Sequence, residues 1–231
     1  MEIHGIQKLT LLDYPGHTAC TVFTGRCNFR CPFCHNASLV LRPSEQPIID
    51  PAELFALLRK RKGLLDGVCI TGGEPTLQKD LSELCAEIKA LGFLVKLDTN
   101  GTNPALLASL IERKLVDFVA MDIKTSREQY GRVCGIPGYD TAPVEESVEL
   151  LKSGNLPYEF RTTVVRELHD QADMEAIGAW LKGAEACYLQ GFRDSGDLIG
   201  SGFSAFSPEE MEDFANILRR YIPNTHTRGV E

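Results

Sequence analysis

The sequence has no long hydrophobic segment. None of its apolar runs approaches the roughly 20 residues that a helix needs to cross a bilayer. The first residues, "MEIHGIQKLTLLDYPG", start with an acidic side chain and lack the basic segment and unbroken apolar core of a secretory signal. These absences predict a cytoplasmic protein that has no membrane partner.

A strongly basic surface is also missing. The 231 residues include 24 Lys and Arg against 32 Asp and Glu, which gives a formal net charge of −8. The one basic run, "RKRK" at residues 59–62, closes a segment of helical periodicity, where positive charge is favourable at the C-terminal end of a helix. We therefore do not expect nucleic acid to be a direct partner.

The eight cysteines lack the even spacing of a disulfide framework. Three of them lie close together in "GRCNFRCPFCHNA", residues 25–37, where Cys27, Cys31 and Cys34 form a C-x3-C-x2-C motif. In a reducing compartment such a group is a candidate metal site, because thiolates bind soft metals. The other five, which we expect to be small buried apolar residues, are Cys20, Cys69, Cys85, Cys134 and Cys187.

Short β-branched and aromatic runs alternate with segments of helical periodicity along nearly the whole chain. This alternation is typical of βα units around a parallel sheet. The six predicted strands are residues 18–23, 67–71, 93–98, 117–123, 158–165 and 186–192. The predicted helices are residues 51–62, 79–91, 104–114, 143–153, 170–182 and 207–221. Because no linker interrupts the pattern, we predict a single domain over residues 1–231.

A closed barrel of this kind needs eight strands, and the pattern offers six. We therefore predict an α/β fold: a partial, laterally open (β/α)6 TIM-like barrel with a parallel sheet. Glycine, acidic, amide and basic side chains gather where the predicted strands end, and the cysteine motif follows the first strand. Since the C-terminal strand ends form the active face of such folds, these residues are expected to share one site. The lateral gap would admit a peptide loop.

Three cysteines leave a fourth ligand position to be explained. A structural zinc ion or a simple iron–sulfur cluster takes four protein ligands. His35, Cys20 or Cys69 could complete a zinc site. The alternative is a [4Fe-4S] cluster in which one iron stays open for a small molecule. The cysteine motif alone favours neither metal, because both bind thiolates.

The C-x3-C-x2-C spacing, with the aromatic Phe33 before the last cysteine, resembles the signature of the radical S-adenosylmethionine (SAM) enzymes. The resemblance implies that Cys27, Cys31 and Cys34 ligate a [4Fe-4S] cluster and that SAM chelates the open iron. An electron from the cluster would then cleave SAM to a 5′-deoxyadenosyl radical. It implies an oxidoreductase with no catalytic residues beyond the cluster and the cofactor.

Other segments extend the resemblance. "TGGEP", residues 71–75, resembles the family's glycine-rich strand-edge motif, in which Gly72, Gly73 and Glu74 would receive the methionine ammonium group. "DTNG" and "MDIK", residues 98–101 and 121–124, resemble segments of the activating enzymes for glycyl radical enzymes. By themselves, "DTNG" also fits an Asx turn and "DIK" a surface ion pair.

The resemblance to activating enzymes assigns further positions to the cofactor. It would place Asp98, Thr99 and Asp122 near the methionine carboxylate, with a small cation near the two aspartates and Lys124 balancing the charge. Arg161 has an equal alternative as a sheet residue paired with an acid, and His35 as a packed loop residue. The remaining cofactor-binding positions implied in this way are Phe33, His35, Asn100, Arg161, Gln190 and Arg193.

"LTLLDYPG" at residues 9–16, followed by "CNFRCPFCHN", resembles the longer activating proteins of anaerobic ribonucleoside-triphosphate reductase. No cysteine lies between Cys34 and Cys69, so the ferredoxin-like insert of other activating enzymes is absent. The resemblance implies abstraction of a glycine α-hydrogen on that reductase, an anaerobic setting and a low-potential flavodoxin or ferredoxin as electron donor. The alternatives are activation of another glycyl radical enzyme, of the formate-lyase type, and a structural zinc-binding module.

Overall fold

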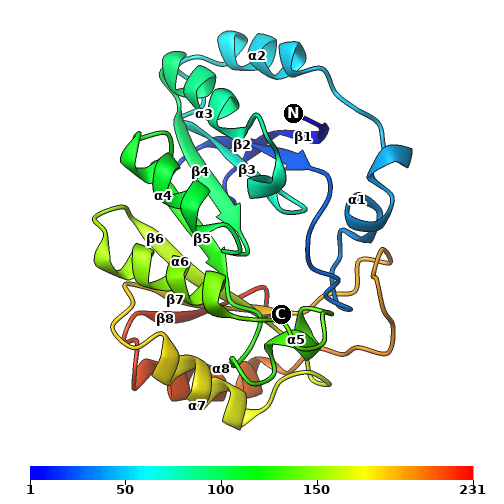
Figure 1. Ribbon diagram of the computed structural model, residues 1–231, viewed down its shortest axis with the longest axis vertical. Coiled ribbons are helices and arrows are strands. Elements are labelled where there is room, and N and C mark those ends of the chain that lie inside the picture. The colour runs from blue at the N-terminus through cyan, green and yellow to red at the C-terminus, as the bar shows by residue number, and fades with distance from the viewer. Residues whose placement is uncertain (231) are drawn as a thin grey trace. The chain divides into compact units, whose positions relative to one another are not determined.

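The structure is a computed structural model and describes residues 1–230 (Figure 1). It divides into two compact units, each made of three stretches of the chain. Unit 1 is Met1–Asn28, Asn36–Thr99 and Asn103–Ala120, and unit 2 is Phe29–His35, Asn100–Thr102 and Met121–Glu231. The chain passes repeatedly between the units, so no single sequence boundary separates them. The single domain over residues 1–231 stays a prediction.

Unit 1 contains four strands and the start of a fifth. β1 (Ile3–Thr10) pairs antiparallel with β2 (Ala19–Thr24), whereas β2 with β3 (Gly67–Gly72) and β3 with β4 (Leu94–Thr99) are parallel. In this register Cys69 lies beside Lys96. The helices of this unit are α1 (Ala37–Leu41), η1 (Pro43–Glu45), α2 (Pro51–Lys60), η2 (Pro75–Leu77), α3 (Leu81–Ala90) and α4 (Pro104–Glu112).

The helices of unit 1 begin where local side chains satisfy the first backbone N–H groups. The Asp50 carboxylate accepts a hydrogen bond from the Ala52 N–H, and α2 starts with a proline, which has no N–H to satisfy. Asn103 accepts a hydrogen bond from the Leu106 N–H in the same way, again before a proline at the first position of α4. Each of these two helices thus begins at a capping side chain that is followed by a proline.

The fifth strand, β5 (Phe118–Asp122), continues from unit 1 into unit 2. Unit 2 also contains β6 (Tyr158–Val164), β7 (Cys187–Gly191) and β8 (Thr225–Arg228), which pair in parallel. α7 and α8 pack against each other, and α8 also contacts β8. The helices of unit 2 are α5 (Tyr130–Val133), α6 (Ala142–Ser153), α7 (Gln171–Trp180) and α8 (Pro208–Arg219).

The strand order in the sheet follows the chain from β1 to β8, and β1 and β8 are its end strands. This confirms an α/β fold with an open, mainly parallel sheet. The predicted count of six strands was wrong, because β1 and β8 add two. β1 is interrupted by register shifts that break its alternation of side chains, and β8 is a four-residue strand, "THTR", without an apolar residue.

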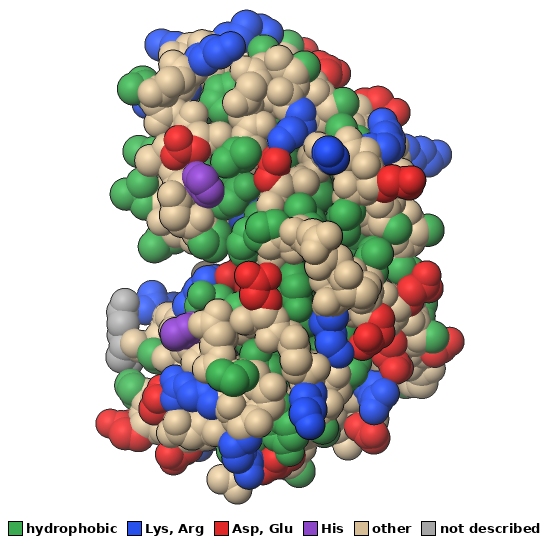
Figure 2. Space-filling view, turned by 90° about the vertical axis from the view of Figure 1, so that its left-hand side faces the viewer, with side chains coloured by type: hydrophobic (Ala, Val, Ile, Leu, Met, Phe, Trp, Pro, Cys, Tyr) green, Lys and Arg blue, Asp and Glu red, His purple; other side chains and the backbone are tan. Residues whose placement is uncertain are grey.

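The lengths of the helices and the distribution of charged side chains bear on the kinds of partner considered from the sequence. Among residues 1–230, none of the helices combines the length and apolar character that a membrane crossing needs. On the face drawn in Figure 2, basic and acidic side chains are interspersed. That distribution agrees with the mixed charge pattern of the sequence.

Candidate cofactor site

The glycine-rich motif after β3 is fastened to the backbone that leads into Cys27. Gly73 N donates a hydrogen bond to Thr24 O (2.8 Å), and Glu74 N donates to Arg26 O (2.7 Å). A Cβ atom on Gly72 would overlap with the backbone of Thr24, and one on Gly73 would overlap with Arg26 O. Gly72 also has a φ of +114°, a conformation that residues with a side chain rarely adopt. Both glycines are therefore required by this close approach.

Two amide side chains hold the same segment of unit 1 from other directions. Gln78 Nε2 donates to Gly25 O (2.9 Å), and Asn36 Nδ2 donates to Gly72 O (3.1 Å). The segment that precedes Cys27 is thus bound to β3 and to the turn that follows it. This arrangement restricts where the backbone at Cys27 can lie in unit 1.

Glu74 is a buried carboxylate held by hydroxyl and amide donors. Only 1% of the residue is exposed. Its Oε1 accepts hydrogen bonds from Thr76 N (3.0 Å), Thr76 Oγ1 (2.6 Å) and Thr99 Oγ1 (2.7 Å). A buried carboxylate is costly unless it is hydrogen-bonded, and these donors stabilise its charged form. Thr99 belongs to the "DTNG" segment, so the structure joins two of the predicted motifs directly.

Asp98, at the C-terminal end of β4, is paired with a lysine that the sequence reasoning missed. The ammonium group of Lys96 contacts Asp98 Oδ1, and Cys69 Sγ donates to the same oxygen (3.7 Å). Lys96 is buried, with 1% of the residue exposed. A lysine inside the predicted strand 93–98, two residues before Asp98 and so on the same face, was the available signal.

In unit 2, the cysteine loop is held by contacts on both sides. Cys34 N donates to Cys31 O (3.0 Å), which forms a turn between these two cysteines. Arg30 N donates to Cys134 O (2.8 Å), and Gly200 N donates to Pro32 O (2.7 Å). Phe33, one of the predicted cofactor-binding residues, is buried. Residues 29–35 of the loop are therefore held within unit 2.

Asp122, at the end of β5, forms ion pairs with both predicted cations. Lys124 Nζ lies 3.1 Å from Oδ2, and Arg161 lies 2.9 Å from Oδ1. Burial alone would raise the pKa of Asp122, but Arg161 and Lys124 outweigh it and lower the pKa to about 2. Both cations are largely buried, with 17% and 12% of the side chains of Lys124 and Arg161 exposed.

The charge on Lys124 is stabilised in turn. Burial would lower the pKa of its ammonium group, but Asp122 and, to a smaller extent, Cys31 raise it above the ordinary value. "DIK" is therefore more than an exposed surface pair. The alternative in which Arg161 is a sheet residue paired with an acid describes its observed contact, and that contact joins Arg161 to a predicted site residue.

Four further predicted residues also belong to unit 2. His35 is exposed, although nearby protein atoms remove enough water to lower the pKa of its imidazole, an effect that Asp122 opposes. Asn100 Oδ1 accepts hydrogen bonds from the backbone and hydroxyl of Thr102, which is the Asx turn considered as an alternative. Gln190 is partly exposed on β7, and Arg193 is exposed in the loop that follows. Their cofactor roles stay predictions.

The donor chemistry of the cysteine motif fits an iron–sulfur cluster. Within residues 1–230, no group of three His, Cys, Asp or Glu side chains has the arrangement of a metal-ion site. The thiols of Cys27, Cys31 and Cys34 are nevertheless the soft donors that such a cluster takes. Cys20, considered as a fourth ligand, is fully buried, and burial raises the pKa of its thiol to about 11. That shift disfavours the thiolate form that binds metal.

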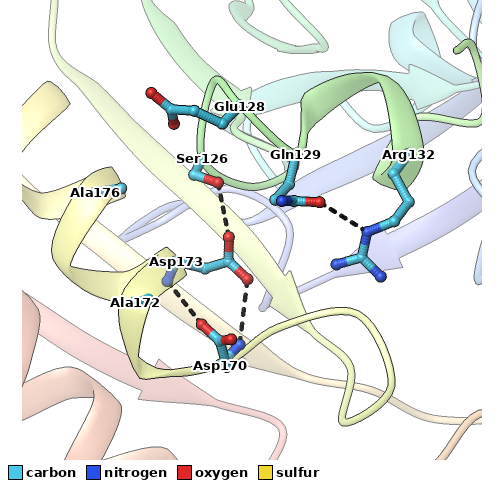
Figure 3. Close-up of a pocket in the computed structure, with 8 residues that line it drawn as sticks. All are labelled: Ser126, Glu128, Gln129, Arg132, Asp170, Ala172, Asp173 and Ala176. Atoms are coloured by element: carbon cyan, nitrogen blue, oxygen red, sulfur yellow. Dashed lines mark hydrogen bonds between the residues drawn. The ribbon is translucent and has the colours of Figure 1, made fainter.

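A pocket of about 290 Å³ lies elsewhere in unit 2, beside the start of α7 (Figure 3). Ser126 Oγ donates to Asp173 Oδ1 (2.7 Å), and the backbone N–H of Asp173 donates to the Asp170 carboxylate (2.9 Å). The bond between Asp170 and Asp173 belongs to the capping box at the start of α7, and Ser126 occupies the other oxygen of Asp173. The lining residues are Ser126, Glu128, Gln129, Arg132, Asp170, Ala172, Asp173 and Ala176. The predicted site residues are absent from this lining.

Comparison with known proteins identifies the family. The family model of the radical SAM superfamily matches residues 21–178, which include the cysteine motif, "TGGEP", "DTNG" and "MDIK". The chain belongs to the radical SAM superfamily. Radical SAM enzymes use a [4Fe-4S] cluster and SAM, which is the chemistry implied by the cysteine motif.

Two relatives in this superfamily show how similarity is distributed along the chain. A protein of Methanocaldococcus jannaschii, provisionally named a glycyl-radical enzyme activating enzyme, is 33% identical over 99% of this chain and 96% of its own length. A protein of Thermococcus kodakarensis, provisionally named a GTP 3′,8-cyclase, is 29% identical over 64% of this chain and 47% of its own length. This radical SAM enzyme is thus similar over almost its full length to a protein provisionally named as an activating enzyme.

A solved structure supports the fold independently. The crystal structure of a domain of pyruvate-formate lyase-activating enzyme from Bacteroides vulgatus matches with a TM-score of 0.58 at 17% identity. The match covers 71% of this chain and 99% of that domain. At this low identity the likeness shows the fold alone, and it confirms the partial barrel with an open parallel sheet that the sequence predicts.

Proposed function

We propose that the chain is an activating enzyme that generates a glycyl radical on anaerobic ribonucleoside-triphosphate reductase. The observation that carries the activating-enzyme class is the 33% identity to a protein provisionally given that name, because the match extends over 99% of this chain. The narrower choice of the reductase is supported by "LTLLDYPG" at residues 9–16, whereas the cysteine-free stretch between Cys34 and Cys69 fits an activator of the reductase or of a formate-lyase-type enzyme. Activation of a formate-lyase-type enzyme is the alternative within the same chemistry.

In this proposal Cys27, Cys31 and Cys34 supply three thiolate ligands to a [4Fe-4S] cluster. Glu74 would accept hydrogen bonds from the ammonium group of SAM, since its carboxylate is buried and already held by the hydroxyl groups of Thr76 and Thr99. When bound, the cluster and SAM supply a one-electron cleavage and the abstraction of a hydrogen atom from the glycine α-carbon. That electron is proposed to come from a low-potential flavodoxin or ferredoxin, because iron–sulfur potentials reach down to roughly −700 mV.

The second group of proposed cofactor residues lies in unit 2. Asp122, held by Arg161 and Lys124, would lie near the carboxylate end of SAM and orient it. The remaining task of the chain is to hold the reacting groups together and keep water out. This chemistry requires no general base or nucleophile from the protein.

Electron paramagnetic resonance (EPR) tests the proposed target. The protein is reconstituted anaerobically with iron and sulfide, reduced with SAM present, and mixed with anaerobic ribonucleoside-triphosphate reductase. We expect a four-iron chromophore, release of 5′-deoxyadenosine and a glycyl doublet in the EPR spectrum of the reductase. A reductase in which the target glycine is replaced by alanine is the matched control and should give no doublet.

Three other outcomes would point elsewhere. A doublet on a formate lyase with none on the reductase would replace the target but keep the activase class. Release of 5′-deoxyadenosine that depends on GTP, with both glycyl radical enzymes silent, would favour the chemistry for which the Thermococcus kodakarensis relative is named. A colourless protein that holds one zinc ion would support the structural zinc module and overturn the proposal.

A further inference from the structure

Lys96 is a lysine enclosed in the centre of β4. Its side chain is 2% exposed, and a buried ammonium group is costly unless a negative or polar group compensates it. The Nζ atom contacts the carboxylate of Asp98, lies 3.9 Å from Cys69 Sγ and lies 6.0 Å from the ring centre of Phe118. A carboxylate, a thiol and an aromatic ring therefore surround the charge.

Lys96 lies behind the candidate site rather than at its surface. In the parallel register of β3 and β4, Lys96 is the partner of Cys69, and Asp98 is two residues nearer to the C-terminal end of β4. Asp98 directly precedes Thr99, whose hydroxyl donates to Glu74. The side chain of Asp98 is 13% exposed, against 2% for Lys96. Any effect of Lys96 on a ligand is therefore expected to pass through Asp98.

We propose that Lys96 is the internal counter-ion of Asp98: its ammonium group holds the carboxylate in place at the edge of the site and replaces a bound metal cation there. The resemblance to activating enzymes implies a small cation near Asp98 and Asp122. Asp122 already has its own cations in Lys124 and Arg161. Each carboxylate is thus balanced by side chains of its own unit. This inference rests on the SAM site of the proposed function and is independent of which protein is activated.

Chemical rescue of SAM binding tests the counter-ion role. SAM affinity is measured anaerobically by calorimetry on the reconstituted wild type, K96A and K96M. Wild-type affinity should be unchanged when sodium and potassium are replaced by choline, and both variants should bind SAM about tenfold or more weakly. Propylammonium should restore much of the affinity of K96A, which leaves room for it. K96M, whose side chain fills that space, should not respond.

Two controls separate charge compensation from general damage. K89M removes the lysine of another Lys–Asp pair in unit 1, in which Lys89 Nζ lies 2.6 Å from Asp117, and should bind SAM like the wild type. Neutral 1-propanol has nearly the size of propylammonium and should not rescue K96A. Equal rescue by both compounds, wild-type affinity in K96M, or a wild-type requirement for a metal cation would each overturn the inference.

Thermal unfolding of the chain without cluster gives a readout that does not depend on SAM. K96M should be less stable than the wild type, because it leaves Asp98 without its cation. The double variant K96M/D98N should recover most of that loss, whereas additive losses would overturn the pairing. If the wild type binds no SAM, the proposed function fails, and these unfolding data still decide the counter-ion role.

Discussion

Three carboxylates of the candidate site are stabilised in three different ways. Glu74 relies on hydroxyl and N–H donors, Asp98 on one buried ammonium group and Asp122 on two cations. The groups that donate to Glu74 are neutral, whereas Asp98 and Asp122 are paired with cations. The three carboxylates therefore differ in the charge of the groups that hold them.

The pairing of Asp122 predicts a specific acid dependence of stability. Its pKa in the folded chain is about 2, below the ordinary value of 3.8, so the unfolded chain binds more protons as the pH falls. The stabilisation by Asp122 is fully present above about pH 4 and is lost as the pH falls towards 2. We expect D122N to lower the free energy of unfolding at pH 7 by on the order of 2 kcal/mol. Urea unfolding of the wild type and of D122N between pH 2 and 7 measures this difference in unfolding free energy.

The way in which this difference in unfolding free energy changes with pH distinguishes a charge effect from a packing effect. The difference between wild type and D122N should shrink to a small part of its pH 7 value near pH 2, because Asp122 is then protonated in the unfolded chain and about half protonated in the folded chain. D213N, which changes an exposed aspartate on α8, should follow the wild-type curve throughout. A difference that is constant from pH 7 to pH 2 would show that Asp122 stabilises the fold through packing rather than charge.

At the scale of elements, the junction between the glycine motif and the segment before Cys27 has the tightest steric requirement. The variant G73A would place a Cβ atom against the carbonyl oxygen of Arg26, where two backbone segments meet. Since backbone cannot move away as a flexible side chain can, we expect a loss of roughly 1–3 kcal/mol in the free energy of unfolding. Denaturant unfolding measures this loss, and iron content after reconstitution shows whether Cys27 is displaced.

A glycine with more room provides the comparison. Gly154 ends α6 with a φ of −87°, and the nearest atom to a Cβ there would be 3.2 Å away. G154A should therefore retain wild-type iron content and lose little stability. If G73A loads iron as well as G154A and unfolds at the same denaturant concentration, the close approach does not constrain the cysteine segment.

At the scale of helices and strands, hydrophobic periodicity in the sequence predicted most of the fold. The six strands and six helices with strong periodicity are confirmed to within a few residues, because burial imposes the pattern that was analysed. β8 was not predicted because its four polar residues have no hydrophobic periodicity. β1 was not predicted because its register shifts break the alternation of apolar and polar side chains. In the site, the motifs predicted Glu74 and Asp122, whereas the pairing of Lys96 with Asp98 depends on side-chain directions inside the sheet.

At the scale of the whole molecule, function is expected to depend on a cofactor pair rather than on the polypeptide alone. A ligand that binds only the folded state raises the unfolding free energy by RT ln(1 + [L]/Kd), which is about 2.7 kcal/mol at 100 times Kd. For a chain of 231 residues this corresponds to a rise in melting temperature of roughly 5–10 °C. We expect SAM to produce this rise in the reconstituted protein.

Removal of the iron is the decisive comparison for that prediction. The open iron of the proposed cluster provides a large share of the contacts to SAM, so chelation of the iron should abolish most of the rise in melting temperature. Differential scanning calorimetry under anaerobic conditions measures both states, with adenosine as a control ligand that lacks the methionine group. An equal rise with SAM in the iron-free chain would show that residues such as Glu74 and Asp122 bind SAM without the cluster, and that the three cysteines serve another purpose.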